Sequence, residues 1–432
     1  MVRKGIAAMK RSIAFVITRM NWYRFLAPVI ERALSNGWHV ECWHDVGRFN
    51  PNRPEDFPDK DKALSYSSGS PVILEFQDVE TIYKWIKERK VDAVCDIAPP
   101  TTKLREICKE SRNHSVYICL NANADWHVYV DDPSLINAVD IFALNTPYWL
   151  DQSLEMMKSR SPIWWNDDLR NLVSAKTTFV GWPQLDQLQM ISPDEIRKEY
   201  GIPVGKPIVV YFNWVDSHLF GLRQKMFSST SLKDRLLSVF RKIDGFPAYL
   251  KFCFEPNLEQ TMKAIRRFCD KNDAFLILKH RFRDKPFECE CKAADLIISD
   301  ESYFPHTIFK VLSVASLSLG YFSFAVRESI ACKVPFLSID ACGLADLKSW
   351  KENGEPFYRQ WSKPLGPFNY KGIVSVMKNS DLVRSFQDFS MSDFVFEERI
   401  YDEYKEKYLS DCKVPNSDFL LDTIESLIKS RN

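Results

Sequence analysis

The alternation of short apolar runs with longer amphipathic stretches constrains the fold of this chain more than any other feature of its sequence. In the first half the apolar runs lie at 12–18, 38–43, 71–76, 91–97, 115–120, 138–144 and 176–180. Amphipathic stretches that predict helices lie at 22–35, 79–88, 102–111 and 148–158. This order is typical of βα units, whose strands assemble into a parallel sheet covered by helices.

The same pattern restarts in the second half of the chain. Strands are expected at 207–212, 248–253, 274–278, 296–299, 317–321 and 334–339, and helices at 258–271, 306–315 and 325–332. Ser192 and Pro193 form a typical helix start, and Gly201 a typical helix end. Since 432 residues suffice for two domains, we predict an α/β protein with two Rossmann-like, doubly wound lobes. The predicted boundaries are 1–190, 191–371 and a helical segment over 372–432.

Charge and cysteine content exclude several classes of protein. The chain has 58 Lys and Arg against 57 Asp and Glu, a net charge of +1. Binding to a nucleic-acid backbone requires a basic excess, so no nucleic-acid partner is expected. Of 11 cysteines only Cys289 and Cys291 lie close together, and a single C-x-C pair is a poor zinc motif. We expect reduced thiols and a cytoplasmic location.

Membrane spans and two common nucleotide motifs are not found in the sequence. The apolar run at 13–17 is much shorter than the roughly 18 residues that a spanning helix needs. The basic segment 1–11 is interpreted as a solvated leader, with peripheral contact to an anionic membrane left open. Neither a P-loop motif nor a G-x-G-x-x-G motif is present, which argues against a P-loop NTPase and an NAD-dependent oxidoreductase.

Residues that follow the predicted strands are the first candidates for a site. Two doubly wound lobes are expected to enclose a cleft, and such sheets bind ligands at the carboxyl ends of their strands. The strand at 274–278 runs into a basic cluster that could offset the charge of a diphosphate, or form a solvated turn. The cluster contains Lys279, His280, Arg281 and Arg283.

Two further groups follow later strands of the second half. Pro305 is expected to open a helix with His306 in its first turn, where free N–H groups favour phosphate. Ser323 lies in a turn and can offer a hydroxyl to an anion, and Glu328 lies on the next short helix. A carboxylate there could accept hydrogen bonds from ribose hydroxyls. Alternatively, His306 is a polar helix-start residue and Glu328 an exposed helix carboxylate.

Three segments together resemble the GT-B glycosyltransferases, and within that fold the surface-polysaccharide branch of teichoic-acid glycerophosphate transferases and capsule Kdo transferases. Segment 320–339 is similar to their donor-site signature, and 279–283 to a basic Lys-Pro-His-Pro-type loop. Segment 178–186 resembles the Val-x-Gly-x-Pro-x-x-Asp junction that ends their N-terminal lobe. Phe282 departs from the expected proline, and no glycine pair precedes Glu328.

The resemblance implies a donor-binding C-terminal lobe and an acceptor-binding N-terminal lobe. The donor would be a nucleotide-activated sugar or polyol phosphate, with cytidine or uridine as the nucleoside. The acceptor would be a glycan or lipid-linked glycan at the inner face of the cell membrane. No metal cofactor is expected, since the D-x-D run at 59–61 lies in a polar loop. Two alternatives stay open: a nucleotide-sugar 2-epimerase, and a non-catalytic scaffold in polysaccharide assembly.

An inverting transfer needs a general base, which the N-terminal lobe should supply. Asp96 ends an apolar strand before a Pro-Pro turn and is the first choice. Asp125 is the second choice and Asp45 a third. Residues predicted to contact the acceptor are Arg19, Arg24 and Trp126.

Overall fold

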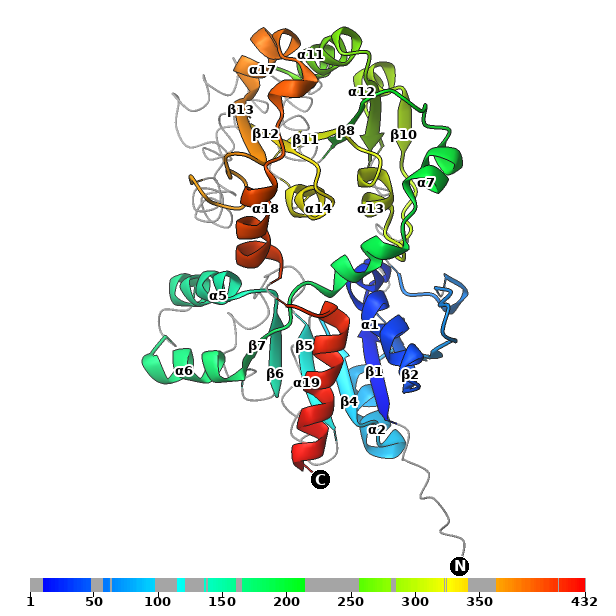
Figure 1. Ribbon diagram of the computed structural model, residues 1–432. Helices are drawn as coiled ribbons and strands as arrows, with labels where there is room; N and C mark the ends of the chain where they lie inside the picture. Colours follow the sequence, from blue (N-terminus) through cyan, green and yellow to red (C-terminus); the bar gives the residue numbers. More distant parts are fainter. Residues whose placement is uncertain are drawn as a thin grey trace, which may run out of the picture. The chain divides into compact units, whose positions relative to one another are not determined.

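The chain folds into two compact units, each with its own sheet (Figure 1). The computed structural model describes residues 11–47, 57–62, 64–97, 115–120, 136, 139–160, 165–213, 256–280, 285–321, 323, 325–340, 363–410 and 412–431. Unit 1 comprises Met1–Gln187 and Lys405–Asn432, and unit 2 comprises Leu188–Tyr404. The predicted fold class, α/β with two Rossmann-like lobes, is confirmed.

Unit 1 contains a seven-stranded sheet in the order β3-β2-β1-β4-β5-β6-β7. Its strands are β1 (Ser12–Ile17), β2 (His39–Asp45), β3 (Val72–Phe76), β4 (Ala93–Asp96), β5 (Val116–Leu120), β6 (Ile141–Leu144) and β7 (Thr177–Phe179). All neighbouring strands pair in parallel. The inner strands β1, β4, β5 and β6 are mostly apolar and buried along nearly their whole length, as expected for a parallel sheet covered on both faces.

Helices cover the sheet of unit 1, and two of them come from opposite ends of the chain. The α-helices are α1 (Tyr23–Ser35), α2 (Val79–Arg89), α5 (Pro147–Arg160), α6 (Asp167–Lys176) and α19 (Asn416–Arg431). α1 packs against α19 and β2, and α19 also contacts β5, so both lie on one face (Figure 1). Asp78 begins α2, because its carboxylate accepts a hydrogen bond from the Thr81 backbone N–H.

A carboxylate and a glycine fix the return of the C-terminal helix to unit 1. The Asp186 side chain accepts backbone N–H bonds from Asn416 (3.0 Å) and Ser417 (2.6 Å), at the start of α19. Gly181 has a φ of +67°, and a Cβ there would overlap the side chains of Asn416 and Ser410. At the other end of α19, Arg431 forms an ion pair with Asp140.

Unit 2 contains a six-stranded sheet in the order β10-β9-β8-β11-β12-β13, again with parallel neighbours. Its strands are β8 (Ile208–Phe212), β9 (Phe275–Lys279), β10 (Leu296–Ile298), β11 (Leu317–Tyr321), β12 (Phe336–Asp340) and β13 (Val374–Lys378). Gly320 lets β11 approach β8 closely, because a Cβ would lie 3.0 Å from the Phe212 carbonyl oxygen.

Two groups of helices cover the two faces of this sheet. The α-helices of unit 2 are α7 (Pro193–Tyr200), α11 (Leu258–Lys271), α12 (Glu288–Ala293), α13 (Thr307–Leu312), α14 (Ala325–Ala331), α17 (Asn379–Ser385) and α18 (Glu398–Tyr404). α11 contacts α12, α17 and β9, while α13 packs against α14 and α7. Under α11 the core includes the stacked rings of Phe268 and Phe386, 4.2 Å apart.

The C-terminal region differs from the sequence prediction. The segment from 372 was expected to be helical, but its start forms β13, the edge strand of unit 2. Only one of its five residues is buried, so it lacks the apolar run by which the other strands were predicted. The rest of the segment is divided between the two units, since α17 packs on α11 of unit 2 and α19 packs on α1 of unit 1. Neither α6 nor α12 was predicted.

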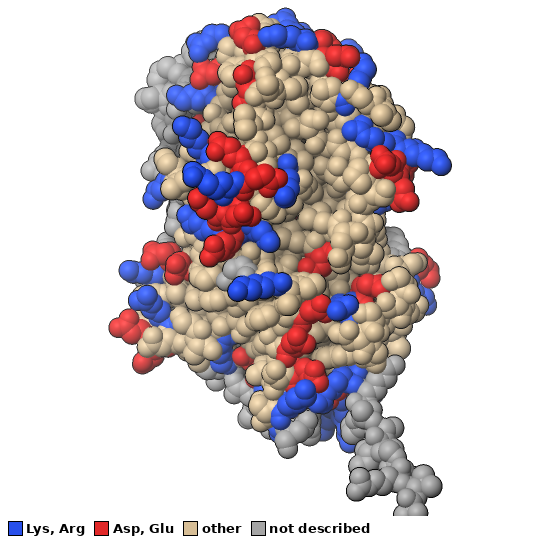
Figure 2. All heavy atoms as spheres, viewed as in Figure 1, with Lys and Arg blue, Asp and Glu red and all other residues tan. Residues whose placement is uncertain are grey.

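The remaining predicted elements within the described residues are present, with ends shifted by a few residues. The helix expected at 102–111 and the strand at 248–253 lie outside the described residues. None of the helices in the described part of the chain combines the length and the apolar composition that a membrane span needs. Acidic and basic side chains lie next to one another over the face that Figure 2 shows, in keeping with the balanced composition.

Candidate functional site

The carboxyl ends of four strands of unit 2 lie level with one another. Phe212 at the end of β8 is in register with Lys279 at the end of β9 and with Gly320 near the end of β11. Lys279 in turn is in register with Ile298 at the end of β10. The residues that follow these strands therefore share one edge of the sheet, as the sequence predicted for the donor-binding residues.

Lys279 is buried at this edge, and its ammonium contacts three oxygens of the protein. Nζ donates hydrogen bonds to the backbone carbonyls of His280 (2.9 Å) and Asp300 (3.2 Å) and lies 3.5 Å from Oε2 of Glu301. Its side chain is 7% exposed. An ammonium has three hydrogens, and three acceptors surround this one. Lys279 thus ties the end of β9 to the loop that follows β10.

His306 is joined to the same glutamate. Its Nε2 lies 3.0 Å from Oε1 of Glu301, and its side chain is 2% exposed. A carboxylate only accepts hydrogen bonds, so this contact places a ring proton on Nε2. His306 directly precedes α13, which begins at Thr307, whereas the sequence placed it inside the first turn. Glu301 was not among the predicted site residues, because its two partners are separated from each other by 27 positions in the chain.

His280 and Asn213 are buried next to these groups. The backbone N–H of His280 donates to the carbonyl of Ile298 (2.9 Å) and so extends the pairing of β9 with β10. Asn213 follows β8 and is 8% exposed, and within the described part of the chain its Nδ2 has no hydrogen-bond partner. The sequence reasoning missed Asn213, although its place directly after a buried strand was available as a signal.

Ser323 and Glu328 lie at the start of α14, as predicted. The Ser323 hydroxyl accepts a hydrogen bond from the backbone N–H of Ala325 (3.2 Å). Glu328 is buried, with 6% exposure, rather than exposed on the helix surface. Burial and then the charge of Glu328 raise the pKa of the Cys332 thiol, one turn further along. The predicted Arg281 and Arg283 lie outside the described residues.

In unit 1 the proposed base Asp96 is a buried carboxyl at the end of β4. It is 0% exposed, and one of its oxygens accepts a hydrogen bond from the Tyr117 hydroxyl. The other, Oδ1, has no partner among the described residues. Burial raises the pKa of Asp96 to about 7, although the Tyr117 hydrogen bond acts in the opposite direction. Its pKa therefore lies near neutral pH, the range suited to a general base.

Other candidates of unit 1 lie near the first two strands. Arg19 is exposed after β1, and Arg24 is half-buried in α1 with its guanidinium 4.3 Å from the centre of the Phe25 ring. Asp45 ends β2, is 3% exposed and accepts the backbone N–H of Gly47 (3.2 Å). The predicted Asp125 and Trp126 lie outside the described residues.

A histidine of β2 was missed by the sequence reasoning. His44 is buried, and its Nε2 lies 2.6 Å from the Tyr23 hydroxyl at the start of α1. Burial lowers the pKa of His44 to about 4, against a weaker opposing effect of Asp59. The ring is therefore neutral at physiological pH.

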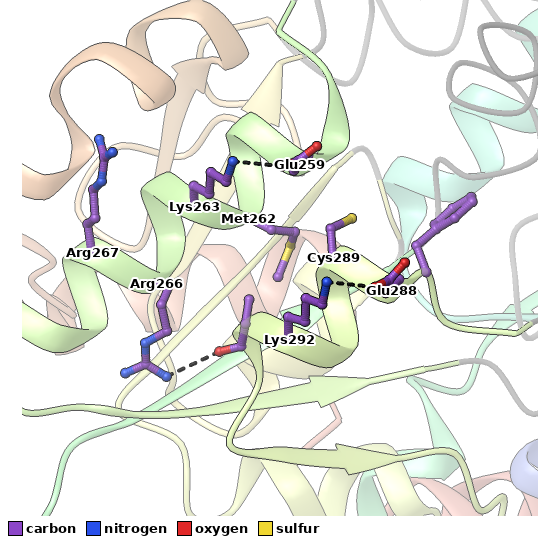
Figure 3. A pocket seen from close by; sticks show the side chains of 10 residues that line it. Glu259, Met262, Lys263, Arg266, Arg267, Glu288, Cys289 and Lys292 are labelled. Atoms are coloured by element: carbon purple, nitrogen blue, oxygen red, sulfur yellow. Dashed lines mark hydrogen bonds and ion pairs between the residues drawn. The ribbon is translucent and has the colours of Figure 1, made fainter. Parts of the chain in front are cut away.

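A separate groove lies on the helical face of unit 2, between α11 and α12 (Figure 3). It has a volume of about 630 Å³, with Met262 and Cys289 between its two helices. Ion pairs within each helix, Lys263–Glu259 (2.7 Å) and Lys292–Glu288 (2.6 Å), line it. None of the residues predicted for the donor site lines this groove. In the described part of the chain no group of three His, Cys, Asp or Glu residues could hold a metal ion.

Comparison with known proteins relates the whole chain to solved structures. No family model matches the sequence, and no curated protein matches it either. The wall teichoic acid polymerase TagF aligns with 97% of this chain and 89% of its own, with a TM-score of 0.55 and 14% identity. A histidine-to-asparagine variant of TagF soaked with CDPG aligns over 98% and 89%, with a TM-score of 0.55 and 13% identity.

A second kind of enzyme is also similar. A putative UDP-N-acetylglucosamine 2-epimerase from Listeria monocytogenes aligns with 98% of this chain and 97% of its own, with a TM-score of 0.52 and 12% identity. These likenesses extend over both units, and both units contain the parallel sheets of a Rossmann-like domain. The chain therefore has the GT-B fold.

Proposed function

We propose that this chain is a glycosyltransferase-type enzyme that moves a sugar or polyol phosphate from a nucleotide-activated donor to a glycan acceptor. The observation that carries the proposal is the level edge of the unit 2 sheet. It gathers polar side chains from four successive segments, of which Asn213, Lys279, His280, His306 and Glu328 are buried and Glu301 and Ser323 half-buried.

Burying polar side chains lowers the free energy of unfolding, and the fold gains nothing from it unless these side chains also have a function. At this edge, hydroxyl, amide and imidazole groups can donate hydrogen bonds to phosphate oxygens, and Glu328 can accept them from ribose hydroxyls. The edge lies at the carboxyl ends of parallel strands, where α/β sheets bind nucleotides. We therefore assign the donor's nucleoside diphosphate to unit 2, with Arg281 and Arg283 as additional phosphate ligands.

The choice of nucleotide draws on the comparisons. A structure of TagF was obtained with CDPG, and the similar epimerase is named for a UDP-sugar. A cytidine or uridine nucleotide is accordingly the proposed donor, and a glycan or lipid-linked glycan at the inner face of the cell membrane the proposed acceptor. The proposed transfer uses no metal cofactor.

Unit 1 would then supply the acceptor site and the base. Asp96 has a pKa of about 7, raised by burial, which suits a group that takes a proton from an acceptor hydroxyl. Asp125 is the alternative base. Arg19, Arg24 and Trp126 are the proposed acceptor contacts.

Product analysis with labelled donors tests this function. CDP-linked and UDP-linked donors are incubated with the protein, with and without a glycan acceptor. The proposal predicts label in the glycan and a free nucleotide that forms only when acceptor is present. Conversion of the donor sugar without any acceptor would identify an epimerase instead. No change of any donor under either condition would contradict both activities and favour the scaffold.

A further inference from the structure

Glu301 joins two buried cationic or ionisable groups of unit 2 through its two oxygens. Oε1 lies 3.0 Å from Nε2 of His306, and Oε2 lies 3.5 Å from Nζ of Lys279. The glutamate side chain is 24% exposed, whereas those of Lys279 and His306 are 7% and 2% exposed. Glu301 is thus the most accessible member of a three-residue cluster at the carboxyl edge of the sheet.

The loop that carries Glu301 is held on both sides. The Lys279 ammonium binds the backbone carbonyl of Asp300 (3.2 Å), and the Tyr200 hydroxyl of α7 donates to the Asp300 carboxylate (3.0 Å). Beyond Glu301, the backbone N–H of Ser302 donates to the Thr307 hydroxyl (2.7 Å), and the Thr307 N–H donates to the Ser302 carbonyl (3.0 Å). The carboxylate therefore sits on an anchored segment and can fix the position of a neighbouring ring.

The contact with Glu301 determines the protonation pattern of the His306 ring. Because the carboxylate accepts the hydrogen bond, Nε2 of His306 carries a proton. Any proton that His306 exchanges with a ligand must therefore be carried by Nδ1. When the ring holds a proton on both nitrogens, it pairs with the Glu301 carboxylate at Nε2 and can donate from Nδ1 to an anion. Carboxylate–histidine pairs orient imidazoles in this way in many enzymes.

We propose that Glu301 is a positioning residue that orients His306 for contact with the donor's diphosphate through Nδ1. Lys279 neutralises the second carboxylate oxygen and anchors the loop, so its own ammonium is not the main phosphate ligand. The inference rests on the proposed function, since it requires a nucleoside diphosphate at this edge. It adds a residue and a division of roles that the sequence motif did not contain.

Two measurements on the intact chain test this role. In the ligand-free protein, nitrogen NMR of the histidine rings, with His306→Asn used for assignment, should show the Nε2–H tautomer for His306. That pattern should change in Glu301→Ala. Calorimetry then compares CDP or UDP, whichever the wild type binds more tightly, with the matching nucleoside. Glu301→Gln should weaken the diphosphate about 10- to 100-fold, the range for a hydrogen bond to a charged group. The nucleoside should bind as before.

A double-mutant cycle shows whether Glu301 acts through His306. In the His306→Asn background, Glu301→Gln should cause little further loss of diphosphate affinity, because the group that it positions is gone. The matched control is Glu199→Gln, which removes a carboxylate that pairs with Lys310 of α13 (3.1 Å) outside the cluster. That variant should bind the diphosphate like the wild type.

The outcomes separate this inference from the proposed function. If the wild type binds neither diphosphate, the proposed function fails and the inference with it. If the wild type binds but the losses add in the double variant, or diphosphate and nucleoside weaken equally, Glu301 is structural and the inference alone fails. Should Glu301→Gln not fold, His306→Asn takes its place, and an unchanged diphosphate affinity in that variant would overturn the inference.

Discussion

Single buried side chains decide what chemistry each unit can offer. Asp96 and His44 both lie near the carboxyl ends of strands of unit 1, but burial raises the pKa of the first to about 7 and lowers that of the second to about 4. Both shifts favour the neutral form of the group. In unit 2, the buried side chains of Lys279 and His306 are instead paired with a carboxylate, because both contact Glu301.

The sequence located most of the described candidates but not their partners. Lys279 was predicted because it follows a strand, His306 because it lies at a helix start, and Glu328 because it lies on the short helix after Ser323. The carbonyl oxygens around Lys279 are brought there by the path of the loop after β10. No local sequence pattern encodes this path. Likewise, the burial of Asp96 against Tyr117 depends on the pairing of β4 with β5.

Replacing Asp96 with Asn should change the pH dependence of stability. The folded-state pKa is raised from 3.8 to about 7, so the contribution of Asp96 to stability is present below about 4 and is lost as pH rises toward 7. Asp96→Asn removes this loss and should gain stability relative to wild type, by about 1.4 kcal/mol per unit of pH in that window. Urea denaturation at several pH values between 4 and 8 measures it. A difference between the two proteins that does not vary with pH would refute the raised pKa.

Secondary-structure elements followed the hydrophobic pattern closely wherever both faces of a strand are buried. β8 and β11 are buried along their whole length, and both were predicted as strands. β13 failed this test because its edge position leaves three of its five residues exposed. The polar start of α6, with Asn166 as its cap, likewise resembles a loop in sequence.

One ion pair, between a buried carboxylate and an arginine at the surface, holds α2 onto the sheet of unit 1. Glu41 of β2 is 2% exposed and accepts hydrogen bonds from Arg89 at the end of α2 (2.7–2.9 Å) and from Trp43 Nε1 (2.8 Å). Burial raises the pKa of Glu41, but these hydrogen bonds outweigh it, so the pKa is lowered overall. The stabilising contribution is therefore present at neutral pH and is lost on acidification.

Arg89→Ala should lower the free energy of unfolding by about 3 kcal/mol at pH 7, because it leaves a buried carboxylate without its counterion. The matched control is Lys84→Ala on the same helix. Lys84 Nζ lies 3.9 Å from Oε1 of Glu88, and both side chains are exposed. That change should cost about 0.5 kcal/mol or less. Equal losses in the two variants, measured by urea denaturation, would show that the Glu41 pair is not the main link.

At the scale of the whole molecule, the chain leaves unit 1 and returns to it at its end. Residues Lys405–Asn432 belong to unit 1, although the sequence grouped them with the preceding helical segment. The return depends on long-range contacts, namely Asp186 with the start of α19 and the packing of α19 on α1. Such contacts are invisible in a local pattern, which is why this part of the organisation was not predicted.

Gly181→Ala should destabilise unit 1 more than the backbone conformation alone explains. Gly181 and Gly201 have nearly equal φ values, +67° and +65°, but a Cβ meets Asn416 and Ser410 only at Gly181. Gly201→Ala should cost about 1–2 kcal/mol, the penalty for a left-handed alanine. Gly181→Ala should cost about 2 kcal/mol more, from overlap with α19. Denaturation of both variants measures these losses of unfolding free energy. Equal losses in the two variants would argue against the tight approach of α19 to Gly181.

The central claim is that the carboxyl edge of the unit 2 sheet binds a nucleoside diphosphate. The most direct measurement is calorimetric titration of CDP and UDP into the wild-type chain and into Glu328→Gln, which removes the negative charge and one oxygen of the proposed ribose acceptor. The wild type is expected to bind at least one of the two, and Glu328→Gln should bind it about tenfold or more weakly at an unchanged melting temperature. The assignment would be contradicted if neither nucleotide gave a heat of binding. It would also be contradicted if Glu328→Gln bound the nucleotide as tightly as the wild type but melted at a lower temperature.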